Sequence, residues 1–403
     1  MQMEYSLKTS DQLILRDGKP FGEEKNFGGS AYNTIMPQTL AGMVRTAIGF
    51  SKSPDYFSSD ENIEAVKTIA VNRIMYYAKL KGANEFLTPP PADVVFTKDG
   101  DGLKFNQLTF GEMPTNCGTD ICNKDWLVPS LGCSEKPAKD APQRWLWDTF
   151  SQYLKEGLAP GTNSKLDSIG LAPMVSNIVI HNGLNSETHS TEDGRLFANK
   201  QLYMAVKKKN GNKNEIVPIG MYFETSESMP TGAMFLGGER KTVEVEETDL
   251  RFPELPNVFN NQRFLKVILI THGKFGGWCP KWLMPNLNAN SIDFVNIPDT
   301  EYRVRLRSAC VNGWDGVSGW DYAGKWDNRE GRRKSVPKPL TKLVRPGSVY
   351  LLELKDPSQS ADIARLLWGN SFCSDEAGND GFNPKNDGFG LAVVGLATKQ
   401  VKI

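Results

Sequence analysis

The stretch that decides the fold lies near the C-terminus and runs Asp387-Gly388-Phe389-Gly390-Leu391-Ala392-Val393-Val394-Gly395-Leu396. Two glycines, Gly388 and Gly390, precede an apolar run rich in valine. Glycine permits positive φ and a close approach of the backbone. We therefore expect a loop whose amides can face a ligand, followed by a buried strand that ends near Ala397.

A short helix precedes this loop, because residues 360–368 place apolar side chains at helical spacing. The order is therefore helix, polar glycine-rich loop, strand. A dinucleotide-binding fingerprint needs the reverse order, in which a strand is followed by G-x-G-x-x-G and then by a helix. The spacing here is G-x-G-x4-G. Both differences exclude a Rossmann-type cofactor site.

Length and composition indicate a globular protein with two domains. The 403 residues exceed the size of one typical core, and 39% of them are hydrophobic. The 47 basic and 47 acidic residues balance, so the net charge points to no particular partner. No apolar run approaches the roughly 18 residues that cross a bilayer, and the N-terminus lacks the layout of a signal peptide. We therefore expect a cytoplasmic protein without a membrane contact.

The six cysteines are sparse for this length and are expected to be free thiols. They are Cys117, Cys122, Cys133, Cys279, Cys310 and Cys373. The first three offer a set of zinc ligands, but their spacing is not that of a CxxC knuckle and no histidine lies nearby. Free thiols in an insertion are therefore the favoured interpretation over zinc, and we expect no metal and no cofactor.

The first half of the chain contains the elements of one α+β unit with large insertions. We expect a first strand within residues 3–15, a helix that Pro37 opens, and a strand over 71–80. Residues 97–142 are rich in Gly, Pro, Asn and Asp and are expected to be loop-like. The remaining expected elements are an amphipathic helix over 143–157 and strands over 201–206 and 215–223.

The second half, which begins after Pro253 and Pro256, has a clearer order. The expected elements are strands over 264–270, 302–311 and 349–354, a helix over 360–368 and a strand from Gly390. This β-α/loop-β-β-α-β order is that of a ferredoxin-like (RRM-type) fold. We predict an α+β protein in which two ferredoxin-like folds pack together. The predicted domains are 1–255, with an insertion around 97–177, and 256–403, with a basic aromatic insertion around 312–345.

The most basic segment of the chain overlaps this second insertion. From Arg303 to Arg345 the chain carries eleven basic and four acidic residues, a net charge of +7 in a chain that is neutral as a whole. The aromatic residues that interleave with its glycines are Trp314, Trp320, Tyr322 and Trp326. Cations beside aromatic faces suit a phosphate backbone with unstacked bases.

Two interpretations of this basic segment stay open on the pattern alone. In one, the tryptophans pack a long excursion onto the body and the basic tip is only solvated. In the other, the segment is an interface, because loops of this length are usually functional or disordered. In that case the tryptophans bury against protein, while the tip residues reach RNA or an acidic neighbour; these are Arg329, Arg332, Arg333 and Lys334.

Three further basic positions are candidate RNA contacts. A lysine cluster surrounds an Asn-Gly hairpin signal and consists of Lys207, Lys208, Lys209 and Lys213. Such a tip is usually only solvated, but it is also where a nucleic-acid contact would reach. Residues 237–241 form a basic turn, Gly-Gly-Glu-Arg-Lys, without the GxxxxGK[ST] spacing of a P-loop. Arg45 lies at the edge of the apolar face of its helix, where composition alone favours a solvated arginine.

The sequence contains no catalytic constellation. The three histidines, His181, His189 and His272, come without an HExxH, GxSxG or paired-cysteine metal motif. Asp387-Gly388-Phe389-Gly390 is not the kinase triplet, because its glycine-loop and catalytic-loop partners are missing. We therefore expect no enzyme activity. A metal-independent ribonuclease that uses His181 with a lysine and a tyrosine is the alternative.

Several short motifs, in order along the chain, resemble those of a known family. They are Arg16–Gly22, Pro37–Ala47, His181–Leu184 with Asp193–Phe197, Leu236–Arg240 and Gly388–Gly395. In these motifs the chain resembles the RAMP superfamily of CRISPR proteins, and most of all the family of the third subunit of the type III-B effector, the Cmr complex. Residues 97–177 carry no part of the resemblance.

The resemblance implies two ferredoxin-like folds in one body and a non-catalytic role. The implied role is to hold the 5′ handle of a guide RNA between the large polymerase-like subunit and the first backbone subunit of the effector. The counterpart subunit of the type III-A effector and a guide-processing endoribonuclease of the same superfamily are the alternatives.

The motifs and the basic positions together give a set of expected RNA contacts. They are Arg16, Arg45, His181, Lys207, Lys208, Lys209, Gly238, Arg240, Lys241, Arg329, Arg332, Arg333, Gly388, Phe389 and Gly390. In a ferredoxin-like unit the first helix and the loop before the last strand can border one groove. We therefore expect Arg45, Arg240 and the amides around Gly388 to Gly390 to bind guide phosphates.

Overall fold

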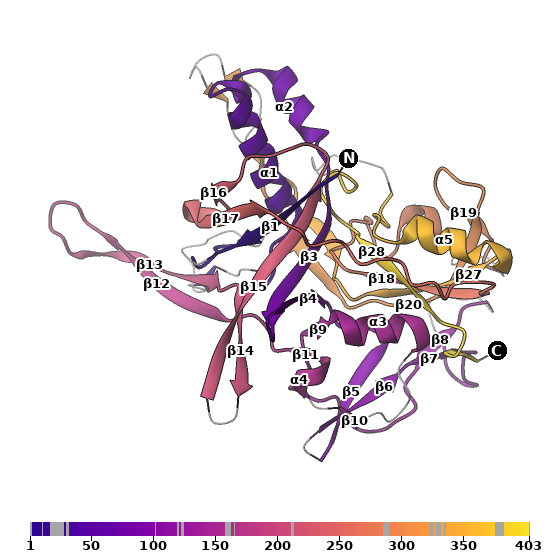
Figure 1. Cartoon of the computed structure of the whole chain (residues 1–403). Coiled ribbons are helices and arrows are strands. Elements are labelled where there is room, and N and C mark those ends of the chain that lie inside the picture. The colour runs from indigo at the N-terminus through magenta and orange to yellow at the C-terminus, as the bar shows by residue number, and fades with distance from the viewer. Residues whose placement is uncertain are drawn as a thin grey trace.

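The computed structural model describes residues 2–9, 11–16, 28–29, 32–100, 102–118, 121, 125–157, 163–164, 166–210, 213–284, 291–321, 326–327, 332–333, 336–374 and 383–402. Within these ranges the chain has a mixed α/β structure made mostly of strands, with few helices (Figure 1). Most of the strands form two large antiparallel sheets and two hairpin arms. None of the helices in these ranges combines the length and apolar character needed to cross a bilayer.

The first large sheet has nine strands in the order β11-β9-β4-β3-β15-β1-β17-β16, and β14 also pairs with β15. The strands are β1 (Met3–Lys8), β3 (Val71–Leu80), β4 (Ala83–Thr88), β9 (Arg144–Leu146), β11 (Gly170–Leu171), β14 (Ala205–Asn210), β15 (Lys213–Thr225), β16 (Gly232–Phe235) and β17 (Thr242–Glu247). The expected strand over 71–80 is confirmed. The expected strand within 3–15 ends at Lys8, and Leu13 makes only an isolated bridge to Leu202.

One face of this sheet is covered by helix α1 (Pro37–Lys52), as the sequence predicts. Pro37 stands in the first turn, where a missing amide costs nothing. Leu40, Val44 and Ile48 recur at helical spacing and are buried in the core that includes β1, β3 and β15. A second helix, α2 (Asp60–Lys67), follows and is capped by the side chain of Ser59.

The second large sheet has five strands in the order β19-β20-β27-β18-β28, and all of its pairs are antiparallel. The strands are β18 (Phe264–Leu269), β19 (Val295–Asn296), β20 (Arg303–Cys310), β27 (Val349–Leu354) and β28 (Ala392–Leu396). Every residue of β18 and of β27 is buried, so this sheet is covered on both faces. Helix α5 (Ser360–Leu367) lies on one side and buries Ile363, Ala364 and Leu367.

The other side of this sheet is covered by helix α3 (Trp147–Glu156), which belongs to the N-terminal insertion. In Figure 1, β18 and β20 lie between α5 and α3. A Cβ atom added to Gly395 would stand 3.1 Å from the Leu154 side chain, a tight contact, so the glycine lets the helix and β28 approach closely without a shift of that side chain. The helix begins at Trp147 and not at residue 143 as expected, because residues 144–146 form the strand β9, which pairs with β4 and β11.

The expectation that residues 97–142 are loop-like is wrong. This region contains β5 (Val94–Asp99), β6 (Gly102–Gln107), β7 (Thr109–Gly111) and β8 (Val128–Ser130). The strands β7 and β8 form a small sheet with β29 (Val401–Lys402), almost three hundred residues further along the chain. These strands are short and end in turn residues, so their pairing depends on distant partners that local composition does not reveal.

Two hairpin arms project from the body (Figure 1). One is formed by β12 (Ser176–Leu184) and β13 (Thr191–Leu202), and β13 also pairs with β2 (Gly28–Gly29). The other is formed by β14 and the first part of β15. The single strand expected over 201–206 is therefore wrong, since those residues end β13 and begin β14.

The basic aromatic insertion around 312–345 contains the paired segments of a long hairpin. The successive antiparallel pairs are β21 (Trp314–Val317) with β26 (Thr341–Val344), β22 (Trp320–Asp321) with β25 (Val336–Pro337), and β23 (Trp326–Asp327) with β24 (Arg332–Arg333). Its base packs on the glycine loop through a small core of Met36, Val317, Leu343 and Phe389.

A fully buried polar cluster joins the insertion to the second sheet. Lys266 of β18 donates to Asp93 at 3.2 Å and to Gln400 at 2.9 Å, and both Lys266 and Asp93 are 0% exposed. Tyr153 of α3 donates to the second oxygen of Asp93 at 2.5 Å. Burial lowers the pKa of Lys266, although Asp93 opposes the shift, and burial raises the pKa of Tyr153. The cluster fixes α3, β18 and the C-terminal segment against one another.

We expect Asp93→Ala to destabilise the protein by about 3 kcal/mol or more, because it leaves the Lys266 ammonium buried without its partner. Urea denaturation measures this change. The matched control is Asp140→Ala, which breaks the exposed pair between Lys98 and Asp140 and should change stability by less than about 1 kcal/mol. Equal losses in the two variants would show that Asp93 is not a structural clamp.

Candidate nucleic-acid interface

The glycine loop at 383–391 crosses the junction between the two large sheets. The amide of Val71, which begins β3, donates to the Asn386 carbonyl at 2.9 Å. The Thr271 hydroxyl, just after β18, donates to the Gly388 carbonyl at 2.7 Å. The amides of Phe389 and Gly390 donate to the carbonyls of Pro384 and His272. These two amides do not face a ligand, contrary to our expectation, and the RNA contact of Gly388 to Gly390 stays a prediction.

Arg45 of α1 reaches this loop, so the structure brings together two of the expected site elements. Its Nη1 lies 2.6 Å from Asp387 Oδ1, and its Nη2 donates to the carbonyls of Ile69 at 2.8 Å and Asn386 at 3.1 Å. The side chain is only 14% exposed, so the interpretation of Arg45 as a solvated arginine is wrong. Its donors therefore clamp α1 both to the loop and to the Ile69 carbonyl, just before β3.

We expect Gly388→Ala to destabilise the protein by about 2–4 kcal/mol. Gly388 has φ +79, and an added Cβ would lie 2.5 Å from the Ile74 side chain and 2.8 Å from the Val71 carbonyl. Gly42→Ala is the matched control, because no atom lies within 4 Å of its added Cβ and it sits inside α1. The control should be neutral or stabilise by about 1 kcal/mol. Thermal melting distinguishes the two, and a neutral Gly388→Ala would contradict the tight junction.

The turn that holds Arg240 differs from the glycine loop in the exposure of its arginine: Arg240 is exposed, whereas Arg45 at the loop is mostly buried. Glu239 and Arg240 both adopt left-handed backbone conformations, with φ 56 and φ 49. Such conformations are costly for residues other than glycine and concentrate at functional sites. Within the part of the chain that the structure describes, the Arg240 side chain has no hydrogen bond or ion pair, and Lys241 follows it directly.

This turn lies at the root of the β12–β13 arm. The Gly238 amide donates to the Ile14 carbonyl at 2.8 Å, which places the turn beside the segment that leads to the exposed Arg16. The Asn199 amide group of β13 donates to the Glu239 carboxylate at 3.3 Å. The structure therefore brings Arg16, Gly238 and Arg240 into one region. The rest of the motif, residues 17–22, lies outside the described residues.

Both arms present side chains to solvent. On β14, Lys207 is exposed and stands opposite Ile216, which is 56% exposed, while Lys208 is half-buried. The Lys209 side chain lies outside the described part. On β12, His181 is half-buried, whereas Ile178, Ile180 and Leu184 on the alternate face are at least 60% exposed. This exposed apolar row was not predicted, because an apolar strand pattern is the same whether the face is buried or open.

The basic aromatic hairpin is held at its base and open further out. Asp315 accepts hydrogen bonds from Arg345 and pairs with His272 Nε2 at 3.1 Å. Burial would raise the pKa of Asp315, but these two partners lower it to about 2. Trp314 is 56% exposed, with the Lys342 ammonium 5.0 Å from its ring centre, so the expected burial of Trp314 does not occur in this chain.

The basic tip predicted for this hairpin is only partly described. Arg329 lies outside the described residues, as do the side chains of Trp320, Trp326, Arg332 and Arg333. Their RNA contacts stay predictions.

Part of the positive charge counted between Arg303 and Arg345 is used inside the protein. Arg305 and Arg307 of β20 both pair with the buried carboxylate of Glu353, as does Arg263. Burial would raise the pKa of Glu353, but the hydrogen bonds from these arginines lower it. This cluster therefore neutralises charge that the sequence count assigned to the RNA.

The flat faces at the centres of both sheets are also occupied. On the second sheet, Lys266 and Gly395 lie beneath Tyr153 and Leu154 of α3. The central strands of the first sheet bury residues of both faces, since Tyr222 belongs to the core that contains β18 and β27. These faces are therefore closed to a ligand, and the open surfaces are turns, arms and edges.

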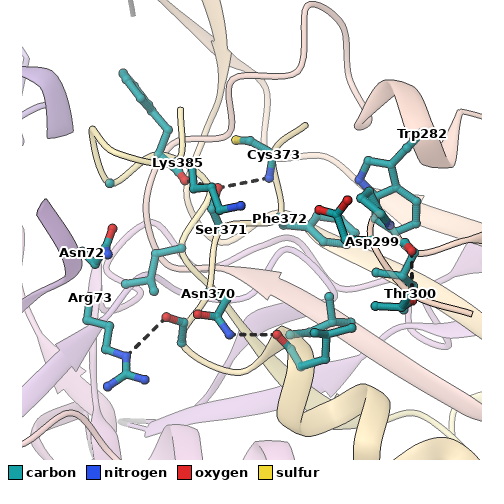
Figure 2. Close-up of a pocket in the computed structure, with 18 residues that line it drawn as sticks. Asn72, Arg73, Trp282, Asp299, Thr300, Asn370, Ser371, Phe372, Cys373 and Lys385 are labelled. Carbon is teal, nitrogen blue, oxygen red and sulfur yellow. Dashed lines mark hydrogen bonds between the residues drawn. The ribbon is translucent and has the colours of Figure 1, made fainter. Parts of the chain in front are cut away.

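A pocket of about 320 Å³ lies between β3 and the segment that follows α5 (Figure 2). Its lining includes Arg73 of β3, Lys385 of the glycine loop and Trp282, none of which the sequence analysis selected. Arg73 gave no signal because it looks like any polar residue within a strand. Its position depends on a bulge against β15, which only the paired strands reveal.

The described cysteines are not gathered with other metal-ligating side chains. Cys117 is exposed, Cys133 is half-buried, and both are free. Among the described side chains, no group of three metal-ligating residues occurs. Cys122, the remaining member of the proposed set, lies outside the described residues.

A family model described as CRISPR-associated protein (Cas_Cmr3) matches residues 5–397. The chain belongs to this family. It is thereby a CRISPR-associated protein of a type III effector, in agreement with the resemblance found in its motifs. A comparison with curated proteins finds no match.

Among solved structures, two cryo-EM structures of the type III-B Cmr-beta bound to cognate target RNA, one of them also with AMPPnP, each align with a TM-score of 0.39. Their identities are 11% and 12%, and the alignments cover 86% of this chain and 86% of theirs. The crystal structure of the Csm3-Csm4 subcomplex of the type III-A interference complex aligns with a TM-score of 0.33 and 11% identity, over 88% of this chain and 94% of that chain.

Proposed function

We propose that this Cas_Cmr3 family member is a non-catalytic RNA-binding subunit of a type III-B CRISPR effector. In this proposal it holds the 5′ handle of the guide RNA and bridges the large polymerase-like subunit to the backbone subunits, in the cytoplasm. The observation that carries the RNA-binding part is the Arg240 turn, an exposed cation held in a left-handed backbone conformation at the root of an arm. A phosphate is the natural partner of such a cation.

We further propose that each large sheet is the core of one ferredoxin-like fold. The support is the strand order. The central strands of the first sheet run β3-β15-β1-β17 and those of the second run β20-β27-β18-β28. Numbered by their order in the chain, both series are 2-3-1-4, the antiparallel arrangement of a ferredoxin-like unit. On this basis the domains are 1–255 and 256–403, with the N-terminal insertion packed on the C-terminal sheet.

The proposed RNA contacts lie on the surfaces that no described helix or strand of the protein covers. Since α3 covers the sheet face that an RRM uses for stacking, the proposed contacts are the Arg240 turn, the lysine-bearing arm and the basic aromatic hairpin. Lys207 and Ile216, which stand opposite each other on one arm, suit a contact with the phosphates and bases of one strand together.

The proposed absence of nuclease activity is supported by the placement of two of the three histidines, His189 and His272. His272 is 3% exposed and pairs with Asp315, so it is committed to the base of the hairpin. His189 lies at the exposed tip of the β12–β13 arm with φ 52. Neither is placed beside a second acid or base at an open surface, as general acid–base cleavage of RNA requires.

The RNA-binding proposal predicts a salt-dependent loss of affinity in Arg240→Ala and in Lys207→Ala. Each lost phosphate contact should lower the slope of log K against log salt concentration by about one and weaken binding several-fold at physiological salt. Filter binding of guide RNA at several salt concentrations measures this. Lys52→Ala is the control. Lys52, at the end of α1, pairs with Glu227, so this variant should bind RNA normally. Unchanged slopes in both test variants would place the RNA elsewhere.

The bridging proposal predicts that deletion of residues 325–334 leaves the melting temperature unchanged and impairs assembly of the guide-loaded complex. The physical reason is that the base of the hairpin is fixed by Asp315 and by the small core under the glycine loop, so the outer part is not needed for folding. Co-purification of the other subunits with the shortened protein measures assembly. Normal assembly would contradict an interface role for this hairpin.

A further inference from the structure

The pocket between β3 and the segment after α5 has chemically different ends. Figure 2 shows Asn72 and Arg73 on one side and Trp282, Asp299 and Thr300 on the other, with Lys385 above. One side is therefore cationic, and the other combines a large aromatic ring with hydrogen-bonding groups. Its volume of about 320 Å³ is in the range of small-molecule sites.

The cationic side is built around an unusual strand residue. Arg73 lies in β3 where the register against β15 shifts between Tyr222 and Glu224, and it has φ 47. Bulges of this kind re-aim a side chain and are common beside functional sites. The guanidinium is held by Glu224 at 3.2 Å and lies 5.1 Å from the ring centre of Phe252. Its side chain is still 34% exposed, so it remains accessible to an anion.

A glycine keeps the space beside Arg73 open. Gly369, at the end of α5, has φ 67, and its carbonyl accepts a bond from Arg73 Nε at 3.4 Å. A Cβ at this position would lie 2.8 Å from the Phe252 ring and 3.0 Å from Arg73 Nε. Any side chain there would therefore displace the guanidinium. Lys385 adds a second exposed cation to the pocket lining.

The aromatic side is equally fixed. Trp282 is half-buried, and its ring meets the buried ring of Phe372 edge to face, with 5.6 Å between centres. Asp299 is exposed with φ 60, in a turn that the Thr300 hydroxyl closes by donating to Ile297 at 2.9 Å. A carboxylate accepts hydrogen bonds only, so at this position it suits an amino group on a planar ligand.

We propose that this pocket binds one nucleoside monophosphate unit, with the base against Trp282 and the phosphate at Arg73 and Lys385. The inference rests on the proposed function, because a nucleotide of the single-stranded guide is the nearest source of such a unit, and a free mononucleotide shares its chemistry. Asp299 then selects bases that carry amino groups, so adenine, cytosine and guanine bind more tightly than uracil.

The test uses the full chain with two kinds of probe. One is a single-stranded RNA hexamer with a central 2-aminopurine, whose fluorescence falls when the base stacks. The others are AMP and UMP, titrated by calorimetry. Trp282→Leu should weaken binding about tenfold and abolish the quenching, whereas Trp282→Phe keeps a stacking ring and should remain near the unaltered protein. Lys385→Gln should weaken binding several-fold and lower the salt slope by about one.

The source of the nucleotide is distinguished by which probe responds. If Trp282→Leu weakens binding of the hexamer, the pocket takes a nucleotide of the strand. If it weakens binding of AMP alone, the pocket takes a free mononucleotide. Arg365→Gln is the control, because Arg365 is an exposed cation on α5 that pairs with Asp362 and does not line the pocket. Only variants whose melting temperature matches that of the unaltered protein are compared with it directly. A variant with a lower melting temperature is compared with Trp282→Phe.

The inference and the proposed function fail in different ways. If Arg240→Ala weakens RNA binding while Trp282→Leu and Lys385→Gln bind the hexamer and AMP normally, the pocket inference is wrong and the proposed function stands. If the unaltered chain binds no RNA, the proposed function is wrong. In that case AMP binding that is weakened by Trp282→Leu would still support a mononucleotide site in the pocket, and no AMP binding would rule the site out. Preference for UMP over AMP would overturn the role of Asp299.

Discussion

The close approach of Gly388 to β3 is the contact on which the arrangement of the two sheets depends. Gly388 accepts a hydrogen bond from Thr271 at the end of β18, while its neighbour Asn386 accepts one from Val71 at the start of β3. One loop therefore joins a central strand of each sheet, and the positions of Ile74 and Val71 leave no room for a Cβ atom. Arg45 closes the junction from α1 through Asp387. The arms, the basic turn and the pocket are all positioned by this frame.

A rigid frame of this kind limits how the protein can meet RNA. Ferredoxin-like proteins that bind RNA on the sheet use exposed aromatic residues of the central strands. In the second sheet these strands are β18 and β27, whose residues are all buried, and the polar cluster of Lys266 and Asp93 seals the face toward α3. Opening that face would expose a paired charge and the ring of Tyr153. Binding at the periphery therefore needs no rearrangement of the core.

The sequence predicted some elements well because their signals are local. β18 and β27 are buried on both faces, so they appear as unbroken apolar runs, and α5 has a clear helical period. The Arg240 turn was predictable because paired glycines followed by cations define a turn by themselves. β7 was not predictable, since its partner β29 lies at the far end of the chain. The exposure of Ile178 and the bulge at Arg73 also depend on neighbours that no local pattern encodes.

The distribution of charge separates structural cations from candidate RNA contacts. A count along the sequence favours the segment from Arg303 to Arg345, but Arg305 and Arg307 neutralise Glu353, and Arg345 neutralises Asp315. A paired cation has little net field beyond the Debye length, about 8 Å at physiological ionic strength. A phosphate approaching from solvent therefore responds most to exposed cations that have no acidic partner. Arg240 meets this condition among the described residues, which makes a single turn more informative about binding than the most basic segment of the chain.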